Sequence, residues 1–170
     1  NSNDESMTSF SSWGPTDDGR IKPDISAPGC QSDGDGGVTS CSSSGGYNSK
    51  CGTSMACPTV TGLSALIVQD WRLQFPGEPD LRNETLKALL AHTAEDKFNV
   101  GPDCQYGYGS VRVVNAIDQT RSGNFGELEI SHGETVEMLV FVQEPSEVKV
   151  TIAWDDVPAT PLMIPSLVND

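Results

Sequence analysis

Residues 52–58 read Gly-Thr-Ser-Met-Ala-Cys-Pro, and this stretch decides how the rest of the sequence is interpreted. From Ser54 onward, apolar residues recur at steps of three and four, the period of a helix with one buried face. They are Met55, Ala56, Val60, Leu63, Leu66, Ile67 and Trp71. The stretch therefore predicts a turn, entered through a glycine, that leads into a long helix ending before Phe75.

Ser54 lies where this turn meets the predicted helix. A helix start holds a hydroxyl on a rigid element. Its unpaired N–H groups and partial positive charge also favour a developing oxyanion. Two interpretations of these residues remain open: Ser54 is a nucleophile, or Ser54 or Thr53 caps the helix.

The residues on either side of this helix predict mostly loops and one further helix. Residues 1–52 are rich in Ser, Gly, Asp and Pro, and residues 32–50 are close to low complexity. Such a composition is typical of a long surface loop. A second helix is expected from Leu81 to about Ala94, with Asp80 as its N-cap.

The periodicity changes to two from Asn124 onward, which predicts an antiparallel meander with one buried face. Its alternating apolar positions are Leu128 and Ile130, then Val136, Met138, Val140 and Val142, then Val148, Val150, Ile152 and Trp154. Three strands are too few for an independent sandwich. We therefore expect one domain over residues 1–123 and the truncated start of a second over residues 124–170.

Composition limits the partners of the chain. It has 170 residues, with 10 Lys and Arg against 24 Asp and Glu, and a net charge of −14. This acid excess argues against nucleic acid and anionic membrane surfaces as partners. No apolar run approaches the roughly 20 residues of a membrane span. The chain opens without Met or an apolar leader and ends directly after a strand-like stretch, so we interpret it as a piece of a longer protein.

Four of the five cysteines lie between residues 30 and 57 of a stretch rich in Gly and Ser. Local disulfides in an oxidising compartment explain this grouping, and they favour a secreted or cell-surface protein. Free thiols in a cytosolic protein remain the alternative, and the spacing does not match a zinc site. We expect a disulfide among Cys30, Cys41 and Cys51, with Cys30–Cys51 or Cys41–Cys51 as the leading pairs. Cys57 is expected to be a buried free thiol.

Residues 52–58 resemble the nucleophile motif of the subtilisin-like serine peptidases. Further blocks resemble this family in the same order: Ser9-Phe10-Ser11-Ser12 with Gly14-Pro15, Lys22-Pro23-Asp24, Ala27-Pro28-Gly29, and Gly107-Tyr108-Gly109 with Val113 and Asn115-Ala116. Residues 150–156 and 167–170 are similar to the β jelly-roll domain that follows the peptidase in some members. The resemblance implies an α/β fold: the C-terminal part of a three-layer parallel-sheet domain, followed by a truncated antiparallel jelly roll.

The resemblance also implies a serine endopeptidase that hydrolyses polypeptides through an acyl-enzyme. Ser54 would be the nucleophile, and its own backbone N–H would be one donor of the oxyanion hole. Gly52, Thr53 and Met55 would lie next to the substrate. No cofactor is required and no metal is expected at the catalytic site.

The partners of the nucleophile are not expected within this chain. In this family the chain order is Asp, His, Ser, so both partners and the side-chain donor of the oxyanion hole belong before Ser54. Asp18 and Asp35 lie in polar loops, and His92 and His132 follow Ser54. We therefore expect the chain alone to be inactive. A catalytically dead subtilase-like binding or surface module remains the alternative.

Three weaker patterns complete the expectations. Asp33 with Asp35, and Asp155 with Asp156, could hold calcium as a structural ion. Asn83-Glu84-Thr85 has the spacing of a glycosylation site.

Overall fold

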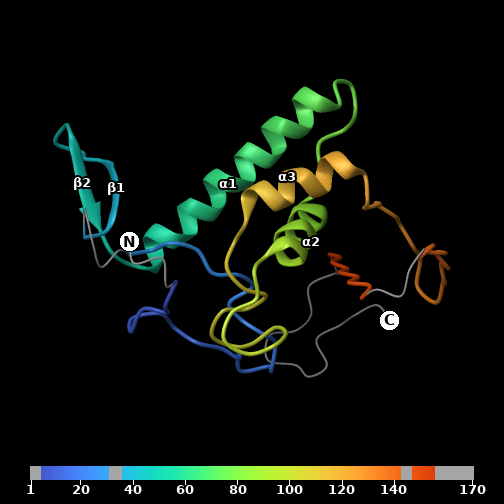
Figure 1. Cartoon of the computed structure of the whole chain (residues 1–170), viewed down its shortest axis with the longest axis horizontal. Coiled ribbons are helices and arrows are strands. Elements are labelled where there is room, and N and C mark those ends of the chain that lie inside the picture. The colour runs from blue at the N-terminus through green and yellow to red at the C-terminus, as the bar shows by residue number, and fades with distance from the viewer. Residues whose placement is uncertain (1–4, 31–35, 143–146, 156–170) are drawn as a thin grey trace.

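The computed structural model describes residues 5–30, 36–142 and 147–155, and the regular elements in these ranges are a β-hairpin and three helices. They are β1 (Val38–Cys41), β2 (Tyr47–Lys50), α1 (Thr53–Gln74), α2 (Asn83–Thr93) and α3 (Val113–Ser122). Figure 1 shows α3 lying between α1 and α2, while the hairpin projects beside the start of α1. No helix in the described ranges is both long and apolar enough to cross a bilayer.

Most of the predicted apolar stripe of α1 packs against the other helices, because its period brings one face toward them, but Leu66 of that stripe is exposed. Ile67 is completely buried, at 0% exposure. It belongs to a core of six buried residues from α1, α2, α3 and their connections: Ile67, Leu81, Leu89, Leu90, Val111 and Ala116. Both α1 and α2 pack against α3, so α3 connects these two helices within the core.

Contacts between aromatic rings and one hydrogen bond hold the C-terminal end of α1. The Trp71 ring centroid lies 4.4 Å from that of Phe75 and 5.8 Å from that of Phe125. The indole N–H of Trp71 donates to the carbonyl of Pro79 at 2.9 Å. These contacts hold the connection after α1 and the chain after α3 on one side of the helix.

Asp80 does not cap α2, contrary to the sequence prediction. The N-cap residue is Arg82, without a side-chain cap hydrogen bond. Asp80 instead forms an ion pair with Arg72, 2.6 Å apart. The guanidinium of Arg72, in the last turn of α1, competes for the carboxylate and explains the difference.

The hairpin and α3 were not predicted. Residues 38–50 pair in the register Val38↔Lys50 to Cys41↔Tyr47, although their composition suggested a loop. Gly45 and Gly46 close the turn with φ of 87° and 75°, which glycine adopts without strain. Backbone pairing, which does not depend on apolar side chains, forms this hairpin.

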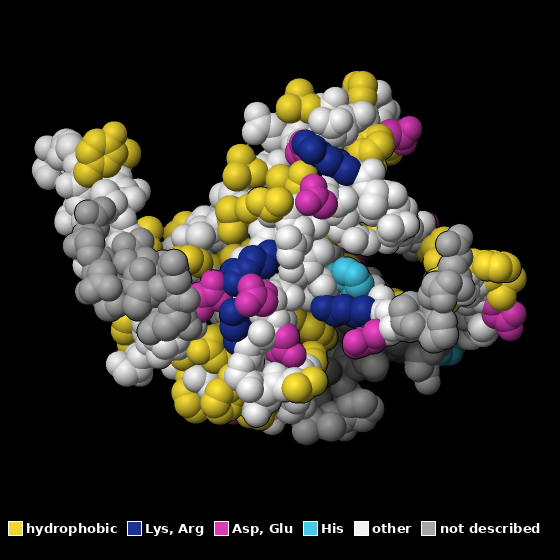
Figure 2. Space-filling model, viewed as in Figure 1, with side chains coloured by type: hydrophobic (Ala, Val, Ile, Leu, Met, Phe, Trp, Pro, Cys, Tyr) yellow, Lys and Arg dark blue, Asp and Glu magenta, His cyan; other side chains and the backbone are white. Residues whose placement is uncertain are grey.

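The predicted strands after Asn124 are not present as strands in the described residues 124–142 and 147–155. The apolar side chains that were expected to form the buried face stand exposed there, with Val150 at 74% and Ile152 at 76%. In Figure 2, exposed hydrophobic side chains lie at the end of the molecule that is formed by the segment after α3. A strand needs a neighbour for its backbone groups, and the described part of this region contains no paired neighbour.

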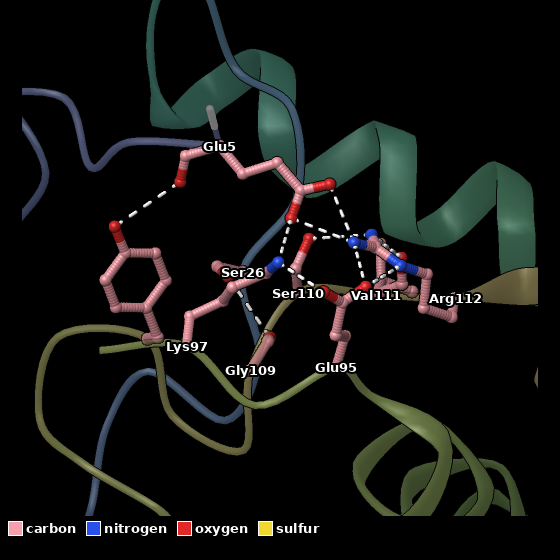
Figure 3. Close-up of polar contacts among 9 residues, drawn as sticks. Glu5, Ser26, Glu95, Lys97, Gly109, Ser110, Val111 and Arg112 are labelled. Carbon is pink, nitrogen blue, oxygen red and sulfur yellow. Dashed lines mark hydrogen bonds and ion pairs between the residues drawn. The ribbon is translucent and has the colours of Figure 1, made fainter. Parts of the chain in front are cut away.

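A polar cluster joins four segments that are separated in the sequence (Figure 3). Ser26 and Ser110 form a parallel bridge, and Glu95 and Ser110 an antiparallel one. Beside them, Arg112 Nη2 donates to the Glu5 carboxylate at 2.7 and 2.9 Å, and its Nε donates to Glu95 at 2.8 Å. We call Glu5, Glu95, Lys97 and Arg112 the ion cluster.

The ion cluster brings two carboxylates and two cations together. Lys97 Nζ lies 3.1 Å from Glu5 and also pairs with Glu95. Burial by itself raises the pKa of Glu5, but the hydrogen bonds from Lys97 and Arg112 outweigh this and hold the pKa below its usual value. The cluster therefore keeps both carboxylates charged and ties Glu5 to the connection between α2 and α3.

Residues 147–155 lie along α2. Lys149 Nζ donates to the His92 carbonyl at 2.6 Å, and Asn83 donates to Asp155 at 2.7 Å. His92 Nδ1 and Thr151 Oγ1 are 3.0 Å apart. Burial, and next the charge of Lys149, lower the pKa of His92 below its usual value of 6.5.

Replacing Ile67 by alanine should destabilise the fold, because it leaves a cavity at the centre of the core. We expect a loss of about 2–5 kcal/mol in the free energy of unfolding, measured by urea denaturation. Leu66→Ala is the matched control, since Leu66 is 49% exposed and its removal leaves no comparable cavity. Equal losses for the two variants would contradict this assignment of the core.

Acidification should loosen residues 147–155 from α2. A lowered pKa means that the folded chain binds fewer protons than the unfolded chain, so stability at His92 is complete above pH 6.5 and falls as the pH drops below it. Nuclear Overhauser contacts between the side chain at position 92 and Thr151 should weaken between roughly pH 7 and 5. His92→Gln keeps a hydrogen-bonding amide and should remove this dependence. An unchanged pH profile in that variant would show that another group is responsible.

Candidate active site

Ser54 lies in the first turn of α1 and is exposed. The N-cap of the helix is Gly52, with φ of 156° and ψ of 162°, and no side chain makes a cap hydrogen bond. The structure therefore excludes the interpretation in which Thr53 or Ser54 caps the helix. The Ser54 hydroxyl is therefore available at the surface. It makes no hydrogen bond to any described residue.

The backbone around Ser54 presents free polar groups. The Gly52 carbonyl accepts from the N–H of Met55 at 3.0 Å and of Ala56 at 3.4 Å. No hydrogen bond between described residues uses the N–H of Ser54. An unused first-turn N–H at the positive end of a 22-residue helix suits the binding of a negatively charged oxygen.

Pro58 lies inside α1 and changes the hydrogen bonding of the site. Proline has no N–H, so the Ser54 carbonyl, four residues earlier, receives no helical hydrogen bond from it. The Thr59 hydroxyl does not replace this bond: it donates to the Met55 carbonyl at 2.9 Å and to the Pro28 carbonyl at 3.4 Å. The second turn of α1 is thus in contact with residues 27–30.

Gly29 forms the support under the turn. The N–H of Gly52 donates to the Gly29 carbonyl at 2.9 Å. A Cβ at Gly29 would lie 2.7 Å from the Gly52 carbonyl oxygen and 3.2 Å from the Ala56 Cβ. Only glycine allows this close approach, so the Ala27-Pro28-Gly29 motif has a physical role in holding the turn.

A disulfide joins the residues next to this contact. It links Cys30 and Cys51, one of the two leading pairs that the sequence predicted, with Cα atoms 4.6 Å apart. Cys41 and Cys57 are free and exposed. The prediction of burial was wrong for Cys57, because the described elements pack against the opposite face of α1 and leave its side uncovered.

Among the described residues, no other titratable candidate is hydrogen-bonded to Ser54. His92 contacts Thr151, and no hydrogen bond between described residues joins His92 or His132 to Ser54. The hydrogen bonds from Arg20 and then Thr16 lower the pKa of Asp18 to about 2, as expected for a surface carboxylate with a local partner. Asp35 lies outside the described residues.

The calcium expectation gains no support in the described residues. Asp33 lies with Asp35 outside them, as does Asp156, and Asp155 accepts a hydrogen bond from Asn83. The described part of the chain contains no group of three or more His, Cys, Asp or Glu side chains suited to a metal ion.

Gly29→Ala should disturb the turn that carries Ser54, because the added Cβ meets backbone and not a flexible side chain. We expect a loss of roughly 1–3 kcal/mol in the free energy of unfolding, measured by urea denaturation. Gly62→Ala is the matched control: a Cβ there meets nothing within 4 Å. In a helix it should stabilise by roughly 0.5–1 kcal/mol. If Gly29→Ala left the free energy of unfolding unchanged, the close contact between Gly29 and the Gly52 backbone would be contradicted.

Known proteins resemble this chain in sequence and in fold. The Subtilase family matches residues 1–109. A C5a peptidase of Streptococcus pyogenes serotype M18 is 35% identical over 120 residues, covering 67% of this chain and 10% of the relative. The minor extracellular protease Vpr of Bacillus subtilis is 38% identical over 118 residues, covering 66% and 14%. The patellamide maturation protease PatA has a similar structure, with a TM-score of 0.51 and 25% identity over 68% of this chain and 39% of that one.

These similarities have two consequences. The chain spans only 10% and 14% of the two sequence relatives, so it corresponds to a small part of each. The matched residues include the exposed serine, the glycine turn and the Gly29 support described above. The chain belongs to the subtilase family of serine peptidases and has its α/β fold.

Proposed function

We propose that this chain carries the nucleophile of a serine endopeptidase. The observation that supports the proposal is the placement of Ser54: exposed in the first turn of α1, on a glycine turn held against Gly29. Ser54 Oγ attacks the scissile carbonyl and forms an acyl-enzyme, which water then hydrolyses. The unused N–H of Ser54 donates to the oxyanion.

The general base and its carboxylate partner come from residues outside this chain. Neither histidine of the chain contacts Ser54 among the described residues, and a serine without a base is a poor nucleophile. Gly52, Thr53 and Met55 lie along the backbone that a polypeptide substrate would approach. No cofactor is needed for this chemistry, and calcium, if bound, has a structural role.

The wider organisation of the protein belongs to the same proposal. Residues 1–123 form the C-terminal part of a three-layer peptidase domain, with the parallel bridge between Ser26 and Ser110 as part of its central sheet. Residues 124–170 begin a β jelly-roll domain, which the period-two pattern supports. The disulfide, and the relative named as an extracellular protease, favour a secreted or cell-surface protein.

Labelling with a fluorophosphonate tests the nucleophile. The reagent forms a bond between Ser54 Oγ and phosphorus, fluoride leaves, and the base accepts the hydroxyl proton. A longer protein that carries this chain behind the preceding part of a subtilase domain should be labelled at Ser54 and should cleave casein. Ser54→Ala should reduce both signals by roughly 10³-fold or more.

Two controls make this test specific. Ser43→Ala removes an exposed serine from the hairpin turn and should leave labelling unchanged. The 170-residue chain alone should give no label above background, and labelling at Ser54 there would place the base inside these residues. Absence of labelling in the longer protein would favour a catalytically dead binding or surface module.

A further inference from the structure

The Cys30–Cys51 disulfide occupies a position that links two parts of the site. Cys30 directly follows Gly29, and Cys51 directly precedes Gly52, so the disulfide lies beside the hydrogen bond between these glycines. Cys51 also follows Lys50, the last residue of β2. The disulfide therefore joins the hairpin and the turn of Ser54 on one side to residues 27–30 on the other.

Few other contacts between described residues make the same connection. The hairpin stays closed without the disulfide, since β1 and β2 pair along their whole length. Residues 24–27 stay in place through hydrogen bonds of Ser26 with Gly109 and Val111. Between the two units, the described contacts are the Gly52–Gly29 hydrogen bond, the packing of Gly29 on Ala56 and the long Thr59–Pro28 contact.

The disulfide is accessible to a reductant. Cys51 is exposed and Cys30 is half-buried. Solvent-exposed disulfides are the ones that exchange readily with external thiols.

We propose that the Cys30–Cys51 disulfide is a redox-sensitive positioning element, which holds the Ser54 turn in its reactive geometry when oxidised and releases it when reduced. The effect on catalysis rests on the proposed function of Ser54, whereas the release of the turn does not. A dithiol supplies the two electrons and two protons: its thiols become a disulfide, the Cys30–Cys51 bond breaks, and each cysteine gains a hydrogen. Cys30 and Cys51 do not touch the substrate and act through Gly29 and Gly52.

Hydrogen exchange of this chain tests the release directly. Reduction by dithiothreitol should accelerate exchange of the Gly52 amide by about tenfold, because a single exposed hydrogen bond then protects it. The amides around Ile67 in α1 should not change, which separates local release from unfolding. Reoxidation should restore the original rate.

The rate of fluorophosphonate labelling tests the effect on Ser54, in the longer protein described above. Reduction should lower the limiting labelling rate by about tenfold with little change in the concentration needed for half-saturation, since misplacement of a reacting atom costs rate. The Cys30→Ser, Cys51→Ser double variant should show the lowered rate with no response to dithiothreitol. The triple variant Cys41→Ser, Cys57→Ser, Cys104→Ser should keep the full response, which excludes the free thiols.

The outcomes separate the two proposals. Unchanged exchange at Gly52 after complete reduction, confirmed by mass, would overturn the positioning role even if Ser54 is labelled. Faster exchange with no labelling in either redox state would uphold the release of the turn and contradict Ser54 as a nucleophile. An equal loss of protection around Ile67 would mean that the disulfide only stabilises the whole fold, and would also overturn the inference.

Discussion

The hydrogen bond from Gly52 to Gly29, at 2.9 Å, is the constraint on which the site depends. It requires two glycines, one with φ of 156° at the helix start and one with no room for a Cβ. Because Gly52 directly precedes α1, this contact sets where the helix begins and where Ser54 emerges. A side chain at Gly29 would push the turn away from its support, and a side chain at Gly52 would strain the backbone, so the two glycines determine the geometry of the reactive group.

The support itself is held by the rest of the fold. Ser26 pairs with Gly109 and Val111, and Ser110 pairs with Glu95, so residues 24–27 lie in a frame made by the connections of α2 and α3. The ion cluster closes this frame by joining Glu5 to Arg112. In a chain with only 10 basic residues against 24 acidic ones, placing two cations between two carboxylates removes local repulsion where three segments converge.

Local sequence patterns were informative where the physical cause is local. The period of α1 predicted its extent and most of its buried face, with Leu66 as an exception, because that period follows from the helix itself. α3 was missed although Val113, Ala116, Ile117 and Thr120 have helical spacing, since the segment is short and was interpreted only through its resemblance to other proteins. The ion cluster carried no signal, because Glu5, Glu95 and Arg112 meet only after the chain has folded. The strands expected after Asn124 depend on partners that local sequence does not specify.

By itself, the sequence determined the long helix, the turn of small residues before it and the family to which its motif belongs, because each depends on residues within a few positions of one another. It also narrowed the disulfide to two leading pairs. The tertiary structure decided between these pairs, because only folding brings Gly29 under Gly52 and sets Cys30 beside Cys51. It likewise decided that Ser54 stands exposed and does not cap the helix, because Gly52 takes the cap position when it is drawn against Gly29. Contacts between distant segments are selected by the packing of the whole chain, and no local pattern encodes them.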